Sequence, residues 1–200
     1  MLRSPLNHYR DLVDNGVFIP DPAQENAVRA LDALWKKLLD TGKQSILDRF
    51  RRRPYPHVKG LYLWGGVGRG KTRLIDLFFD DLPIKQKKRV HFHRFMHRVH
   101  AALADAGHVR DPLQLIAEQW ARNCRVLCLD EFFVSDIADA MLLAGLLESL
   151  FSNGVTLVTT SNIEPCGLYR DGLQRAKFLP AIDLIRNHTR VMELTGSTDY

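Results

Sequence analysis

Apolar and polar positions along this chain repeat with two different periods, one typical of helices and one of buried strands. A helical period is clearest after Asp21 and Pro22, where the apolar residues lie on one stripe: Ala27, Val28, Leu31, Leu34, Trp35 and Leu38. Short runs that are apolar on both faces stand at 60–64, 125–129 and 155–160. Such runs are typical of central strands in a parallel sheet.

The rest of the chain continues this alternation of strands and helices. We expect further strands at 90–95 and 189–194, and helices at 73–79, 112–123, 137–151 and 180–187. Pro5, Gly16 and Pro20 predict that residues 1–20 are irregular. Strands that alternate with helices predict an α/β fold, in which a parallel five-stranded sheet is flanked by helices in three layers.

The bulk composition is that of a globular protein. The 200 residues are 46% apolar and 26% charged, with a formal net charge of +5. We expect a helical extension and a basic connector over 1–59, with arginines at 49 and 51–53, followed by a core domain over 60–200. Sparse cysteines, no apolar leader and no apolar run of membrane length predict a cytoplasmic protein without a membrane span.

A glycine-rich stretch lies between an expected strand and an expected helix. Its residues match Gly-x-x-x-x-Gly-Lys-Thr at every fixed position: Gly65, Gly66, Val67, Gly68, Arg69, Gly70, Lys71 and Thr72. Glycines let the backbone curl so that N–H groups point at phosphate oxygens near the positive end of the helix. Lys71 is expected to reach the β- and γ-phosphates, and the Thr72 hydroxyl to bind Mg²⁺. This stretch therefore predicts a triphosphate site.

Two acids end the apolar run at 125–129. Asp130 stands where a phosphate-loop protein holds the Mg²⁺ that bridges the β- and γ-phosphates. Glu131 is expected to face the γ-phosphate and to polarise a water molecule for in-line attack. A kinase requires an acceptor site instead, so the acidic pair favours hydrolysis.

Four more polar residues are candidates for the site. Asn162 follows the strand expected beside Asp130, where an amide senses the γ-phosphate or simply turns the chain. Arg175, and after it Arg170, are candidates for a guanidinium supplied to a neighbouring subunit's phosphates, with surface arginine as the alternative. Gln24 is expected either to recognise adenine or to serve as the third residue of a capped helix, and the sequence leaves both roles open.

A histidine-rich segment raises the question of a metal site. His93, His97 and His100 share a face only if the whole segment is helical. We expect the change from strand to helix to fall inside the segment, which breaks that face and favours ordinary packing and surface histidines. Phe95 in the same segment is expected in the core rather than in a threading pore.

Four segments together resemble the ZapE family of bacterial cell-division ATPases of the AAA+ class, which has mitochondrial relatives. They are residues 60–72, 91–96, 130–137 and 172–182, and the likeness spans nearly the whole chain. The resemblance implies a P-loop core of the AAA+ type that binds ATP and Mg²⁺ and hydrolyses ATP. It also implies action on the division ring built from FtsZ and a homo-oligomer that forms with nucleotide.

A different function stays open beside this one. Helicase loaders share the AAA+ core, and the basic stretches at 49–53 and 85–89 fit a switch protein that binds nucleic acid. Members of the ZapE family continue into a helical lid that carries a second sensor arginine, whereas this sequence stops at Tyr200. We therefore expect a core without its lid, with weak nucleotide affinity and slow turnover.

Overall fold

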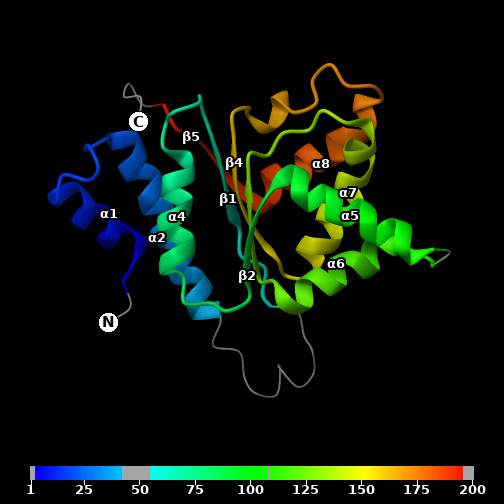
Figure 1. The fold of residues 1–200 in the computed structure, drawn as a ribbon, viewed down its shortest axis with the longest axis horizontal. Helices are drawn as coiled ribbons and strands as arrows, with labels where there is room; N and C mark the ends of the chain where they lie inside the picture. The colour runs from blue at the N-terminus through cyan, green and yellow to red at the C-terminus, as the bar shows by residue number, and fades with distance from the viewer. Residues whose placement is uncertain (1–2, 42–54, 108, 196–200) are drawn as a thin grey trace.

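A parallel sheet forms the middle layer of the molecule. The computed structural model describes residues 3–41, 55–107 and 109–195 (Figure 1). The five strands are β1 (Gly60–Trp64), β2 (Lys87–His91), β3 (Val126–Asp130), β4 (Thr156–Ser161) and β5 (Thr189–Glu193). They lie in the order β2-β3-β4-β1-β5, and each neighbouring pair is parallel. The predicted α/β architecture is confirmed.

Helices cover both faces of this sheet. One face carries α1 (Pro5–Asp14), α2 (Pro22–Thr41) and α4 (Lys71–Asp81). The other carries α5 (Phe92–Ala106), α6 (Pro112–Asn123), α7 (Ile137–Ser152), the short helix η1 (Pro165–Gly167) and α8 (Arg175–His188). Among the described residues, no helix combines the length and apolar character needed to cross a membrane.

The central strands β1, β3 and β4 are buried on both faces because each face of the sheet builds a separate core. Leu61 and Leu63 of β1 pack with the stripe of α2 and with α4, whereas Tyr62 between them packs with the helices of the other face. Strand β3 alternates in the same way, with Cys128 on the first side and Leu129 on the second. This alternation is the side-chain period of a strand buried on both sides.

The structure corrects the expectation that residues 1–20 are irregular. Helix α1 occupies Pro5–Asp14, with Pro5 at its first position and Ser4 as its cap. The Ser4 hydroxyl accepts a hydrogen bond from the Asn7 N–H at 3.5 Å. Buried Tyr9 then packs edge-on against Phe18, with 5.7 Å between ring centroids. Helix α1 is thereby held in the layer that covers one face of the sheet.

The strand expected at 90–95 is placed too late in the chain, although the change from strand to helix does fall inside the histidine-rich segment, directly after His91. Strand β2 covers Lys87–His91, and α5 begins at once with Phe92. Strand β2 lies at the edge of the sheet and is only half buried, so its residues are mostly polar. The apolar run belongs to the helix, where Phe92, Phe95, Met96 and Val99 follow helical spacing and are buried. The core position expected for Phe95 is confirmed.

Helix α8 begins earlier than expected, at Arg175 rather than Pro180. Its buried residues Phe178, Ala181, Ile182 and Ile185 form one stripe, which starts before the proline. Pro180 therefore lies inside the helix, and Arg175 lies in its first turn.

Candidate functional site

The loop between β1 and α4 has the backbone that its glycines predict. Three of them have positive φ angles, which are +152° at Gly65, +78° at Gly68 and +79° at Gly70. A Cβ added to Gly65 would lie 2.7 Å from the carbonyl oxygen of Leu194, so a side chain does not fit there. Helix α4 begins directly at Lys71 and points its N-terminus into the loop.

The side chain of Lys71 is folded back onto this loop. Its ammonium group donates hydrogen bonds to the carbonyls of Gly65 at 2.8 Å and Gly66 at 2.6 Å, and the residue is only 8% exposed. Burial, together with the nearby charge of Arg69, lowers the pKa of Lys71 below its ordinary value. A phosphate anion beside the ammonium would favour the charged form and offset both effects.

A pocket of about 430 Å³ lies over the loop and the ends of two strands. Its lining residues come from the loop and α4, from the end of β3 and from the end of β4: Val67, Gly68, Arg69, Gly70, Lys71, Thr72, Arg73, Glu131, Thr160, Ser161 and Asn162. The structure therefore brings together the predicted loop, Glu131 and Asn162. Gly65, Gly66 and Asp130 lie beside this lining rather than in it.

Glu131 has an unusual backbone for a glutamate. Its φ angle is +56°, in the left-handed region that residues other than glycine seldom adopt, and its side chain is 74% exposed. The Glu131 N–H donates to the hydroxyl of Thr160 at 3.1 Å. One carboxylate oxygen lies 3.9 Å from Nδ1 of His91 at the end of β2. Thr160 thus helps to hold the conformation that places the Glu131 side chain against the pocket.

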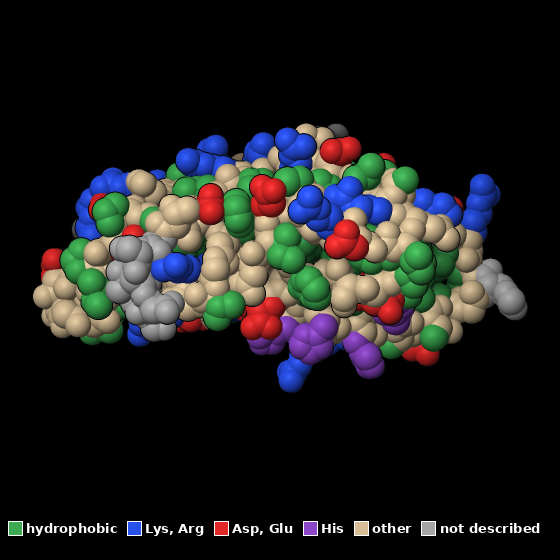
Figure 2. Space-filling model, turned by 90° about the horizontal axis from the view of Figure 1, so that it is seen from above, with side chains coloured by type: hydrophobic (Ala, Val, Ile, Leu, Met, Phe, Trp, Pro, Cys, Tyr) green, Lys and Arg blue, Asp and Glu red, His purple; other side chains and the backbone are tan. Residues whose placement is uncertain are grey.

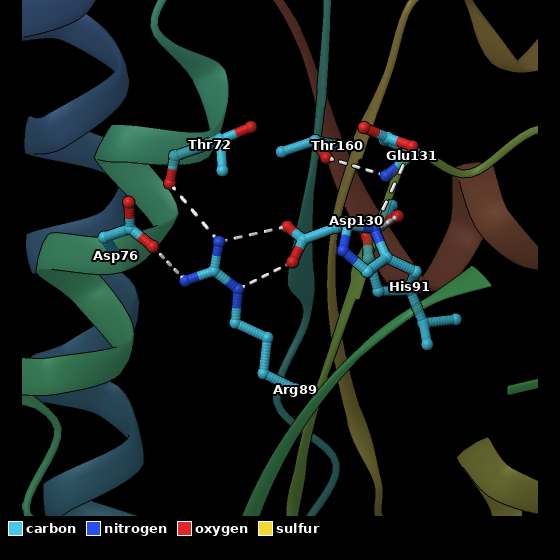
Figure 3. Close-up of polar contacts among 9 residues, drawn as sticks. Thr72, Asp76, Arg89, His91, Asp130, Glu131 and Thr160 are labelled. Carbon is cyan, nitrogen blue, oxygen red and sulfur yellow. Dashed lines mark hydrogen bonds and ion pairs between the residues drawn. The ribbon is translucent and has the colours of Figure 1, made fainter. Parts of the chain in front are cut away.

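Asp130 is bound by an arginine that the sequence did not single out (Figure 3). Nε of Arg89 donates to Oδ2 of Asp130 at 2.7 Å, and Nη2 donates to Oδ1 at 3.3 Å. Arg89 also pairs with Asp76 of α4. Burial opposes the charge on Arg89, but its hydrogen bonds to the two carboxylates, together with their negative charge, outweigh burial and raise the pKa of the guanidinium.

The oxygen groups at this point fit a magnesium ion. Mg²⁺ prefers hard oxygen ligands and keeps several waters, so one or two protein groups and the substrate phosphates suffice. The Thr72 hydroxyl and the Asp130 carboxylate supply such oxygens. Within the described ranges, no cluster of three or more His, Cys, Asp or Glu side chains has a metal-binding arrangement.

The histidines of α5 do share one stretch of helix, contrary to the expectation. His93 and His97 are exposed, and Nε2 of His100 lies 2.7 Å from an oxygen of Asp139 in α7. Figure 2, seen from above, shows histidine side chains gathered along one side of the molecule. The pairing of His100 with Asp139 joins α5 to α7, and ordinary packing and surface roles account for the segment.

Of the remaining predicted residues, one lines the pocket and the others do not. Asn162 is exposed and lines it. Gln24 is buried in α2, and its side-chain amide donates to the carbonyl of Arg69 at 3.3 Å, so it supports the loop. Arg170 is exposed, and Nη2 of Arg175 donates to the carbonyl of Cys166 at 2.7 Å. Neither arginine lines the pocket, and both stay candidates for a group offered to a neighbouring subunit.

A sequence model of the AFG1-like ATPases matches residues 3–200. The chain belongs to the AFG1-like ATPase family. This AFG1-like chain is 47% identical over 209 residues to the cell division protein ZapE of Escherichia coli K12, with 98% of the chain and 56% of that protein covered. It is 40% identical over 247 residues to lactation elevated protein 1 homolog B of Danio rerio, with 98% and 49% covered. The chain therefore spans about half the length of these curated relatives.

Solved structures of replication proteins share the fold of this AFG1-like ATPase. The crystal structure of DnaI superposes with a TM-score of 0.60 at 20% identity, with all of the chain and 92% of DnaI covered. DnaA from Aquifex aeolicus bound to AMPPCP superposes with a TM-score of 0.58 at 14% identity, with 89% and 49% covered. These likenesses show that the chain shares the fold of these proteins.

Thr160 and Arg89 are site residues that the sequence analysis missed. Each contacts a predicted residue from a neighbouring strand, so finding them requires the strand order and register. Thr160 belongs to β4 and Arg89 to β2, on either side of β3. A polar residue within a strand is the only signal for either one in the sequence.

We predict that Thr160→Val slows ATP turnover while Thr160→Ser does not. Valine has nearly the shape of threonine but leaves the part-buried Glu131 N–H without its acceptor, which removes a hydrogen bond of about 0.5–1.5 kcal/mol. Steady-state phosphate release from the two variants measures the effect, with nucleotide affinity as the control. Equal turnover in both variants would show that the hydroxyl does not hold Glu131.

Proposed function

We propose that this AFG1-like chain binds ATP with Mg²⁺ and hydrolyses it. The observation that carries the proposal is the pocket over the glycine loop, because it brings Lys71, Thr72, Glu131 and Asn162 to one place from three segments of the chain. The pocket thus offers phosphoryl transfer to water a positive helix N-terminus, a lysine, a hydroxyl, an acid and an amide, with Asp130 beside it.

Each residue of the site has a distinct part in this reaction. The loop from Gly65 to Thr72 holds the phosphates with its N–H groups, and Lys71 leaves the loop carbonyls to bind the β- and γ-phosphates. Thr72 and Asp130 would hold the magnesium ion, which would neutralise charge on the phosphates. Glu131 orients and polarises the attacking water, and Asn162 contacts the γ-phosphate.

We propose a cell-division role in the cytoplasm, acting on FtsZ. The support is the 47% identity to the E. coli protein named cell division protein ZapE, over 98% of this chain. Hydrolysis would then change the state of a protein partner.

The nucleic-acid alternative has less support in the structure than in the sequence. Of its two basic stretches, 49–53 lies outside the described residues. In the other, Lys87 donates to the carbonyls of Phe79 and Leu82, and Lys88 lies 4.6 Å from the ring centroid of Trp120. With Arg89 bound to Asp130, three basic side chains of that stretch have partners within the molecule.

We predict that Glu131→Gln abolishes turnover and leaves ATP binding intact. Glutamine keeps the size of the side chain but cannot take a proton, and a positioned acid or base contributes about 10²–10⁴-fold to rate. Phosphate release gives the rate, and equilibrium binding of a fluorescent ATP analogue gives the affinity. Glu148→Gln, on an exposed position of α7, is the matched control. Undiminished turnover in Glu131→Gln would remove Glu131 from the mechanism.

We also propose that nucleotide drives assembly of a homo-oligomer in which an arginine reaches the neighbouring subunit's phosphates. Arg175 is the first choice and Arg170 the second, since neither contacts the pocket of its own subunit. Light scattering with and without a slowly hydrolysed ATP analogue is expected to show a larger particle only with nucleotide. A monomer under both conditions would contradict an arginine supplied in this way.

A further inference from the structure

The guanidinium of Arg89 connects Thr72 and Asp130, the two protein groups of the proposed magnesium site. Thr72 lies in the first turn of α4, and Asp130 ends β3, so no backbone hydrogen bond of the sheet joins them. Arg89, from the neighbouring edge strand β2, binds Asp130 with two nitrogen atoms at 2.7 and 3.3 Å. Its Nη2 also lies 3.5 Å from the carbonyl oxygen of Thr72.

A second acid holds this guanidinium from the helix side. Nη1 of Arg89 pairs with Asp76, which stands one helical turn after Thr72 (Figure 3). Asp76 and Asp130 therefore hold Arg89 from opposite sides, and all three nitrogen atoms of its guanidinium have partners. The pair with Asp130 is largely shielded from water, with side-chain exposures of 18% for Arg89 and 7% for Asp130.

The geometry calls for arginine rather than for any cation. A planar guanidinium offers a carboxylate two parallel N–H groups and still has a third nitrogen for another acid. A lysine ammonium keeps the charge but binds as a point and cannot span the same partners. The orientation of the Asp130 carboxylate is thus fixed by the shape of Arg89 as well as by its charge.

We propose that Arg89 is a positioning residue for magnesium: it joins the helix that carries Thr72 to the Asp130 carboxylate and holds both in place for the ion. The proposal rests on the proposed nucleotide site. Partners in contact with a metal ligand orient it, and their loss typically weakens metal binding or activity by about 10- to 100-fold. Arg89 does not line the pocket, so we expect it to act on the nucleotide through Asp130 and Thr72 rather than by direct contact.

The sharpest test is Arg89→Lys, because it separates the geometry from the charge. Removal of a cation next to the site would by itself favour Mg²⁺, whereas lysine keeps that charge and loses the paired hydrogen bonds. A fluorescent, slowly hydrolysed ATP analogue is titrated with Mg²⁺ in the parent and in the variant, after its affinity has been measured in excess chelator. We expect Arg89→Lys to need about 10-fold more Mg²⁺ for half-saturation. Its affinity for the metal-free analogue is expected to be unchanged.

Two further variants make the result specific. Asp76→Asn leaves Arg89 in place but removes the charge of its second partner, and because the Asp76 side chain is 49% exposed the fold is expected to tolerate the change. It should raise the Mg²⁺ requirement in the same direction and by less. Arg94→Lys, at an exposed position of α5, makes the same chemical change away from the site and should behave as the parent.

Three results would overturn the proposal. The first is an unchanged or lowered Mg²⁺ requirement in both Arg89→Lys and Asp76→Asn. The second is an equal loss of affinity with and without Mg²⁺, which would show general disruption of the pocket. The third is a parent protein whose binding of the analogue does not depend on Mg²⁺, and this result alone would also remove magnesium from the proposed function.

Discussion

Parallel pairing of β1, β4 and β3 is the constraint on which the site depends. Parallel strands end at one edge of the sheet, so the chain leaves all three strands close to the same point. Backbone hydrogen bonds join the segments that follow these strands to the neighbouring strand. The Gly65 N–H donates to the Ser161 carbonyl at 3.2 Å, and the Phe132 N–H donates to the Thr160 carbonyl at 2.7 Å. The glycine loop, Glu131 and Asn162 therefore surround one pocket.

Charge compensation accounts for the second level of organisation. Lys71 is satisfied by the carbonyls of Gly65 and Gly66, and Asp130 by Arg89. A buried charge without a partner is costly. Each buried charged group of the site therefore needs a hydrogen-bond partner within the protein before the substrate arrives. Lys71 and Asp130 differ in whether the substrate must displace their present partners. Phosphate has to draw Lys71 away from the loop, whereas each Asp130 oxygen has lone pairs left while Arg89 stays bound.

Local patterns were enough to predict the sheet, most helices and the main chemical groups. The stripe of α2, the runs of β3 and β4, and the loop from Gly65 to Thr72 each carry their signal in consecutive residues. The pattern failed where burial depends on neighbours that are distant in sequence. Strand β2 is polar because it lies at the edge, and the contacts of Arg89 and Thr160 follow from the register between strands. Asp130 was found from its position, but its arginine partner was not.

The central claim is that the glycine loop holds a triphosphate while Thr72 and Asp130 hold its magnesium. A crystal structure of this chain with a non-hydrolysable ATP analogue and Mg²⁺ tests it most directly. We expect phosphates along the loop, with Lys71 moved from the carbonyls of Gly65 and Gly66 onto the β- and γ-phosphates. We also expect the metal between Thr72 and Asp130, with Arg89 still bound to Asp130. A nucleotide bound elsewhere, or a metal away from both residues, would contradict the account.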